Sequence, residues 1–187
     1  MSALSLKKQQ LLNALLFQAQ WLICVQADNQ LALISFTIVL LLHINVFNIE
    51  SKEIALIVFF TLVGIIVESL AATLGLIEFP HQNEITAGGH AIFIVPLWLI
   101  IMWANFATTL CHCLAWLQNR IALTFLLTLI FIPLNYFLGA KISGSTYLVS
   151  PHIFLMYETA LWLVLLPLGL WFSAQAGKSA DRVCLIK

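Results

Sequence analysis

The chain has 187 residues, of which 62% are hydrophobic and only 9% are charged, and its formal net charge is zero. A composition this apolar cannot build a water-soluble surface, so lipid must be the solvent. The few, scattered basic residues form no stripe that would bind nucleic acid. The sequence therefore predicts a single integral membrane domain over residues 1–187, with the lipid bilayer as its surroundings and no nucleic-acid partner.

Six long apolar runs follow one another along the chain. A membrane-spanning helix needs about 20 mostly apolar residues, and unbroken apolarity favours helices over the alternating strands of a membrane barrel. We therefore predict an all-α, polytopic membrane helix bundle with short connections. Its six transmembrane helices are expected over residues 11–27, 31–47, 54–77, 90–116, 121–140 and 153–174.

The basic residues predict the orientation of this bundle. Lysine and arginine are enriched in the cytoplasmic loops of membrane proteins. Only Lys141 falls on one side of the predicted membrane, whereas the other side carries Lys7, Lys8, Lys52, Arg120, Lys178, Arg182 and Lys187. Both termini are therefore expected in the cytoplasm, and the loops 28–30, 78–89 and 141–152 are expected on the outer side.

Two carboxylates, Glu68 and Glu158, lie inside the apolar runs. A charged side chain at the bilayer centre costs roughly 2.5 to 3.5 kcal/mol on insertion scales, so such a residue usually faces a bundle interior or a wet cavity. Glu68 should point toward another helix, because three- and four-residue steps place it on one face with Thr61, Gly64, Ala72 and Gly75. Glu68 and Glu158, together with His90, are the candidate catalytic residues.

The fourth run carries a second pattern of polar and aromatic side chains. Helical spacing places on one side Trp98, Met102, Asn105, Thr109, His112 and Trp116. One interpretation is a lined cavity, in which the candidate binding residues are Trp98, Asn105, Thr109 and His112. The alternative is that Asn105 and Thr109 only join helices by hydrogen bonds, which is common in membranes.

The sequence predicts no metal site and identifies no cofactor. Cys111, His112 and Cys113 are adjacent in a predicted helix, where neighbours point about 100° apart and cannot converge on one ion. His112 is therefore interpreted as a hydrogen-bonded interior histidine, and His43 as interior or interfacial. Weak metal candidates at the outer end, without a tight motif, are His81, His90 and His152.

The titratable residues are more frequent toward the outer end of the predicted bundle. Glu68 and Glu158 both lie in its outer half by residue count, and the three outer histidines are on the same side. A pocket, if present, is expected to open toward the outer leaflet between the third, fourth and sixth helices. The alternative is a set of solvated loop residues with an ion pair between Lys141 and Glu158.

Four stretches of the chain resemble a known family: LLNALLFQAQWLICV, GIIVESLAATLGLIEF, PLWLIIMWANFATTLCHCLAWL and PLNYFLGAKISG. They are similar to the landmarks of the bacterial inner-membrane proteins of domain-of-unknown-function family 2878. The resemblance implies a multi-pass protein of the bacterial cytoplasmic membrane, with a gene context similar to that of lipid-modifying enzymes. It implies no catalytic residues.

Three hypotheses about function follow. The first is an enzyme, or an accessory protein of one, that acts on membrane lipid with an outer-leaflet site of carboxylates and histidines. The second is a small-solute or proton-coupled carrier that uses Glu68 and the polar face around Asn105 as a midplane site. The third is a scaffold or assembly protein whose small-residue face around Glu68 binds a membrane-protein partner.

Overall fold

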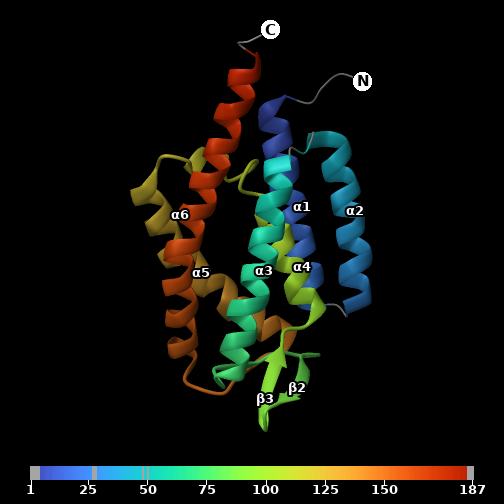
Figure 1. The fold of residues 1–187 in the computed structure, drawn as a ribbon, viewed down its shortest axis with the longest axis vertical. Coiled ribbons are helices and arrows are strands. Elements are labelled where there is room, and N and C mark those ends of the chain that lie inside the picture. Colours follow the sequence, from blue (N-terminus) through green and yellow to red (C-terminus); the bar gives the residue numbers. More distant parts are fainter. Residues whose placement is uncertain (1–4, 27–28, 48, 50, 185–187) are drawn as a thin grey trace.

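The structure is a computed structural model that describes residues 5–26, 29–47, 49 and 51–184. In this part the chain is mostly helical, with six helices: α1 (Leu6–Gln26), α2 (Asn29–Phe47), α3 (Ser51–Thr73), α4 (Leu97–Ala107), α5 (Ile121–Ser143) and α6 (Pro151–Cys184). The helices form a bundle in which α1 begins and α6 ends at the same end of the molecule (Figure 1). The starts of α3 and α5 lie at this end too.

Four of the helices are long and apolar enough to cross a membrane: α2, α3, α5 and the Pro151–Gln175 part of α6. The chain is thus a multi-pass membrane protein by helix length and composition. The remaining two helices do not meet this description. Although α1 has 21 residues, its first turn carries Lys7 and Lys8 and the helix contains several amide side chains. Helix α4 has only 11 residues. Length and composition therefore support four of the six predicted spans.

The single helix predicted over residues 90–116 does not form. Its first part is strand β3 (His90–Ile94), α4 occupies only its middle, and after α4 the chain makes turns that lead to the short 3-10 helix η1 (Ala115–Leu117). Helix α4 packs against α1, α2 and α3, and most of its residues are buried. Irregular backbone at membrane depth is tolerated where protein covers it, so this central helix does not need to span the bilayer alone.

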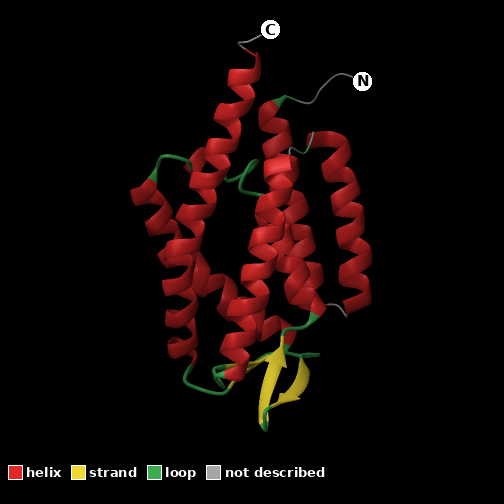
Figure 2. Ribbon diagram, in the orientation of Figure 1, coloured by secondary structure: helices red, strands yellow, loops and turns green. Residues whose placement is uncertain are grey.

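A β-hairpin precedes α4 where the sequence analysis expected a loop and the start of a helix. Strands β2 (Asn83–Ala87) and β3 pair antiparallel, with Ala87 opposite His90. The two residues between them, Gly88 and Gly89, have φ angles of 61° and 81°. Positive φ at both central positions is the type I′ turn that glycine favours. The hairpin lies at the end of the bundle opposite the termini (Figure 2).

Helix α3 ends four residues before its predicted boundary at Ile77 because Gly75 terminates it. Gly75 has a φ of 70°, and the amide of Leu76 donates to the carbonyl of Ala71 at 3.0 Å. This is the Schellman arrangement, in which glycine adopts the left-handed conformation just after a helix. The next residues form β1 (Ile77–Glu78), which pairs antiparallel with β4 (Thr146–Tyr147). The pair joins the segments that follow α3 and α5.

The irregular segment after α4 is held by a polar side chain of α1. The Asn13 amide group donates to the carbonyl of Thr108 at 3.3 Å, and its oxygen accepts the backbone N–H of Cys113 at 3.2 Å. Asn13 itself is buried. Because buried backbone groups need hydrogen-bond partners, Asn13 makes it possible for the chain to leave the helical conformation here.

Candidate functional site

Glu68 is fully buried in α3, as the sequence analysis expected, with 0% of its surface exposed. One of its carboxylate oxygens, Oε1, accepts two hydrogen bonds. The indole N–H of Trp103, from α4, donates at 3.1 Å, and the hydroxyl of Tyr136, from α5, donates at 2.6 Å. The carboxylate therefore links three helices in the interior of the bundle.

Glu158, from α6, is also fully buried. Within the described part of the chain neither of its carboxylate oxygens has a hydrogen-bond partner of good geometry, although Tyr136 and Glu68 lie close enough to interact with it electrostatically. Tyr136 also accepts the indole N–H of Trp162 at 3.2 Å. Two carboxylates from helices distant in sequence, α3 and α6, thus lie near one tyrosine hydroxyl. The exposed Lys141 is not the partner of Glu158 that the ion-pair alternative expected.

Aromatic rings pack closely around these carboxylates. The rings of Trp103 and Trp162 are stacked, with centroids 4.8 Å apart. Gly64 lies directly against Trp103, because a Cβ added to Gly64 would be 2.2 Å from its ring. Around Gly64, the small-residue face of α3 is therefore covered by α4 of the same chain. This part of the face is not free for the partner that the scaffold hypothesis requires.

A cavity of about 420 Å³ extends along the bundle beside this network. It is lined by residues of α1, α4, α5, α6 and η1 and of the loops near β1 and β4, and not by α3, so it differs from the pocket expected between the third, fourth and sixth helices. The lining is mostly apolar and includes Phe17, Trp21, Trp98, Met102, Phe106 and Phe131. Trp103, Tyr136 and Trp162 also line it, so the cavity shares its wall with the carboxylate network.

The shape of the cavity follows helix α5. Its lining residues on this helix run from Leu127 to Ser143, which is about 24 Å at 1.5 Å per residue. The volume is within the roughly 300–1,000 Å³ typical of small-molecule sites. A long, narrow and apolar space of this kind fits a chain-like apolar molecule better than a compact polar solute.

The predicted polar face around Asn105 is not continuous. Because α4 ends at Ala107, Thr109 and His112 do not extend its face. Each polar group makes a separate contact: the Asn105 amide donates to the carbonyl of Phe17 at 3.2 Å, and the Thr109 hydroxyl donates to that of Phe106 at 2.6 Å. The Trp98 indole donates to Pro80 at 3.2 Å. The arrangement fits the alternative in which these groups join segments.

The outer histidines are not brought to the carboxylates. His81, which has a φ of 64°, and His152 are exposed at the hairpin end of the bundle. His90 lies in β3, and its side chain is outside the described part of the structure. Neither His81 nor His152 belongs to a group of potential metal ligands in the part of the chain that the structure describes.

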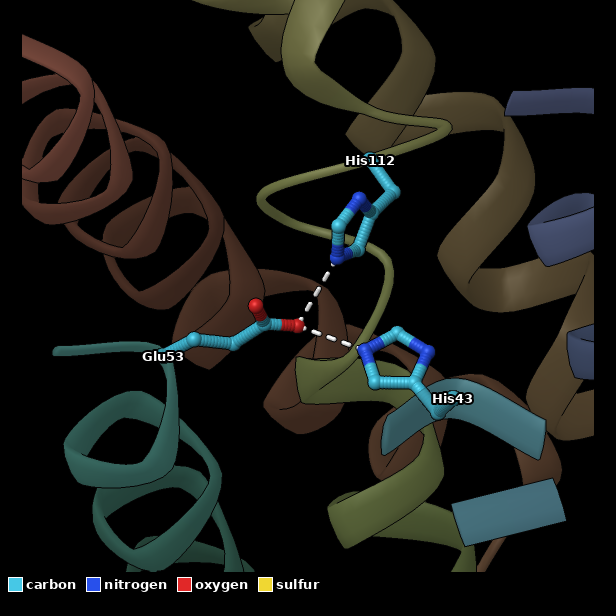
Figure 3. A group of neighbouring side chains, drawn as sticks. All are labelled: His43, Glu53 and His112. Carbon is cyan, nitrogen blue, oxygen red and sulfur yellow. Dashed lines mark hydrogen bonds and ion pairs between the residues drawn. The ribbon is translucent and has the colours of Figure 1, made fainter. Parts of the chain in front are cut away.

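A different set of histidines meets a carboxylate at the other end of the bundle (Figure 3). The Nε2 atoms of His43 and His112 lie 2.6 Å and 2.9 Å from the same oxygen, Oε1 of Glu53. His43 comes from near the end of α2, Glu53 from the first turn of α3 and His112 from the turns after α4. Sequence reasoning missed the group because no local spacing relates its members, and it had assigned Glu53 to a loop.

Comparisons with known proteins connect the chain to one family. No curated protein and no solved structure matches the chain. The family described as "Protein of unknown function (DUF2878)" matches residues 10–168, which include the buried carboxylates and most of the cavity wall. The chain therefore belongs to this DUF2878 family.

Proposed function

We propose that this protein binds a membrane lipid, or another long apolar molecule, in the cavity along α5, and acts as an enzyme or accessory protein in membrane-lipid metabolism. The observation that carries the proposal is the cavity itself, an apolar space of about 420 Å³ that follows α5 for roughly four and a half turns. A lipid would reach it from the bilayer without passing through water.

The carboxylate network supplies the chemistry for this site. Tyr136 lines the cavity and hydrogen-bonds to Glu68, and the second carboxylate, Glu158, lies nearby. A hydroxyl between two carboxylates can pass a proton between them or to a bound molecule, which is the basis of general acid–base catalysis. We assign Glu68, Tyr136 and Glu158 as the candidate reactive groups. The outer histidines of the sequence analysis have no part in this assignment.

The carrier hypothesis has less support. It relied on Glu68 and the polar face around Asn105, but Asn105, Thr109 and His112 each contact a different segment. Asn105 does keep one buried oxygen without a partner in the described structure, but the large cavity offers almost no charged lining. A polar solute would therefore find few groups to replace its hydration.

Filling the cavity is the test of the proposed function. Gly139 lines it, and a Cβ added there would be 3.8 Å from Trp21 and from Val25, which is an ordinary contact. The change Gly139→Phe would thus place a ring in the cavity without a backbone clash. We expect it to reduce photocrosslinking of a diazirine-labelled phosphatidylethanolamine to α5 by at least fivefold. The measurement is mass spectrometry of crosslinked peptides from native membranes.

The matched control is Leu138→Phe, one residue away. Leu138 is 40% exposed on the outside of α5, so this variant should keep the crosslinks of the parent protein. Equal labelling of the parent and Gly139→Phe proteins at the cavity residues would contradict the proposal, as would labelling confined to lipid-exposed positions such as Ile130.

We further propose that the chain crosses the bacterial cytoplasmic membrane six times with both termini in the cytoplasm. Helix α1 would supply one of the two crossings that length and composition do not identify. Helix α4, together with the irregular segments on either side of it, would supply the other. In the described part of the chain, the helix ends that carry or adjoin six of the seven basic residues gather at one end of the bundle. The bias of lysine and arginine toward the cytoplasm supports this orientation.

Reporter fusions test this topology. Alkaline phosphatase, which is active only outside the cytoplasm, should be active when fused after Ser145, and inactive when fused after Arg120 or Lys187. A cytoplasm-specific reporter should give the reverse pattern at the same positions, which controls for expression. Phosphatase activity at Lys187 would contradict the arrangement with both termini inside.

A further inference from the structure

Three side chains with metal-binding atoms converge at the end of the bundle that carries the termini. In the described part of the chain, these side chains are His43, Glu53 and His112. Their ligand atoms all lie within 4.8 Å of one another. Helices α2 and α3 are joined by a short connection, which sets His43 beside Glu53, and the turns after α4 bring His112 over both. Three segments are therefore positioned around one point.

The chemistry of the group matches that of transition-metal sites. Two imidazole nitrogens and one carboxylate, with an open position, are the protein ligands of many catalytic zinc sites and of the two-histidine, one-carboxylate iron sites. His112 is 15% exposed through its side chain, whereas His43 is 1% exposed. Water and an ion can thus approach from the His112 side, and the open position would face that way.

The surroundings keep both imidazole rings in place. The ring of Phe47 lies 4.7 Å from the ring of His43 and 4.7 Å from that of His112, measured between centroids. The two imidazoles are 4.8 Å apart and nearly perpendicular, with an interplanar angle of 82°. An apolar wall of this kind limits solvent at a metal centre and holds its ligands.

We propose that His43, Glu53 and His112 bind a first-row divalent metal ion, for which Zn²⁺ is the test ion. Ligands of a tetrahedral zinc ion with bonds of about 2.1 Å lie roughly 3.4 Å apart. The contacts of 2.6 Å and 2.9 Å to Glu53 are shorter, so the carboxylate must withdraw by roughly 0.5 to 0.8 Å to admit the ion. Glutamate has the rotatable bonds to do so without a backbone change.

The ion should be exchangeable rather than structural. In its absence the two histidines hydrogen-bond to Glu53, so the three side chains stay together and the fold does not require metal. The other ring nitrogen of His43, Nδ1, has no hydrogen-bond partner in the described structure. Histidine ligands usually donate from that nitrogen to a second group, and loss of such a partner typically weakens binding by 10- to 100-fold. A strong chelator should therefore remove the ion and leave the protein folded.

The test uses the full-length protein, purified without a polyhistidine tag in lipid nanodiscs and stripped with a chelator. After incubation with Zn²⁺ and desalting, we expect close to one zinc per chain by elemental mass spectrometry. His43→Gln and His112→Gln should each lower this to less than 0.2 per chain, roughly a fivefold loss. Glutamine keeps a donor for Glu53, and thermal unfolding should confirm that both variants are folded.

The matched control is His152→Gln, which changes an exposed histidine at the opposite end of the bundle and should keep the zinc of the parent. Cobalt provides a second measurement that needs no variant: Co²⁺ bound to the stripped parent should give the visible absorption bands of a four- or five-coordinate site, and Zn²⁺ should abolish them. Equal zinc content in the parent, His43→Gln and His112→Gln, or cobalt without these bands, would overturn the proposal. The group would then only join three segments by hydrogen bonds.

Discussion

Gly64→Leu is expected to prevent accumulation of folded protein in the membrane. A Cβ at this position would lie 2.2 Å from the Trp103 ring, far inside any real contact. Trp103 cannot move aside easily, because its ring stacks on Trp162 and its N–H donates to Glu68. Overpacking usually costs about 1–3 kcal/mol and more where neighbours are fixed, so we expect a loss of about 3 kcal/mol or more.

Fluorescence-detected size-exclusion chromatography and thermal unfolding measure this effect. The control, Ile66→Leu, is two residues away on the same helix at a position that is 64% exposed, and it should behave like the parent. Gly64→Ala alone should also lose folded protein. Adding Trp103→Leu should recover part of it, because the smaller leucine leaves space for the alanine methyl group. Normal folding of Gly64→Leu would mean that α3 and α4 do not pack as described.

Replacement of the two buried carboxylates by leucine is expected to have opposite effects on stability. Glu68→Leu leaves the Trp103 and Tyr136 donors without their acceptor, and an orphaned buried donor costs about 1–3 kcal/mol. Glu158→Leu instead removes a buried carboxylate whose oxygens lack good partners, and replacing such a group by an apolar one is often stabilising, by about 1–3 kcal/mol. Glu68→Leu should therefore unfold at a lower temperature than the parent, and Glu158→Leu at a higher one.

Unfolding temperatures in nanodiscs of constant lipid composition would show this difference. Glu68→Gln is the matched control, because its amide oxygen still accepts both hydrogen bonds and should retain most of the stability. A fall in stability with Glu158→Leu equal to that of Glu68→Leu would show that Glu158 has a structural partner. Residues needed for function are often retained although they lower stability. A higher unfolding temperature of Glu158→Leu would therefore strengthen the assignment of Glu158 to the site.

Some features of the site and of the fold were predictable from local sequence. A carboxylate in an apolar run must avoid lipid, whatever helix covers it, so Glu68 could be assigned to the interior before its partners were known. The hairpin also had a local signal, since Gly88 and Gly89 are the residues that a type I′ turn needs. The apolar residues of β3 concealed it, because short apolar runs do not distinguish a strand from a helix.

Length and apolarity by themselves determined the class of this protein and the helices α2, α3, α5 and α6, because the cost of placing a helix in lipid depends on its own residues. Only the tertiary structure decided the rest. Helix α4 could be short because other helices cover it. The meeting of His43, Glu53 and His112, and of Tyr136 with the two carboxylates, depends on contacts between segments distant in sequence. Such contacts follow from how helices pack, and no residue spacing encodes them.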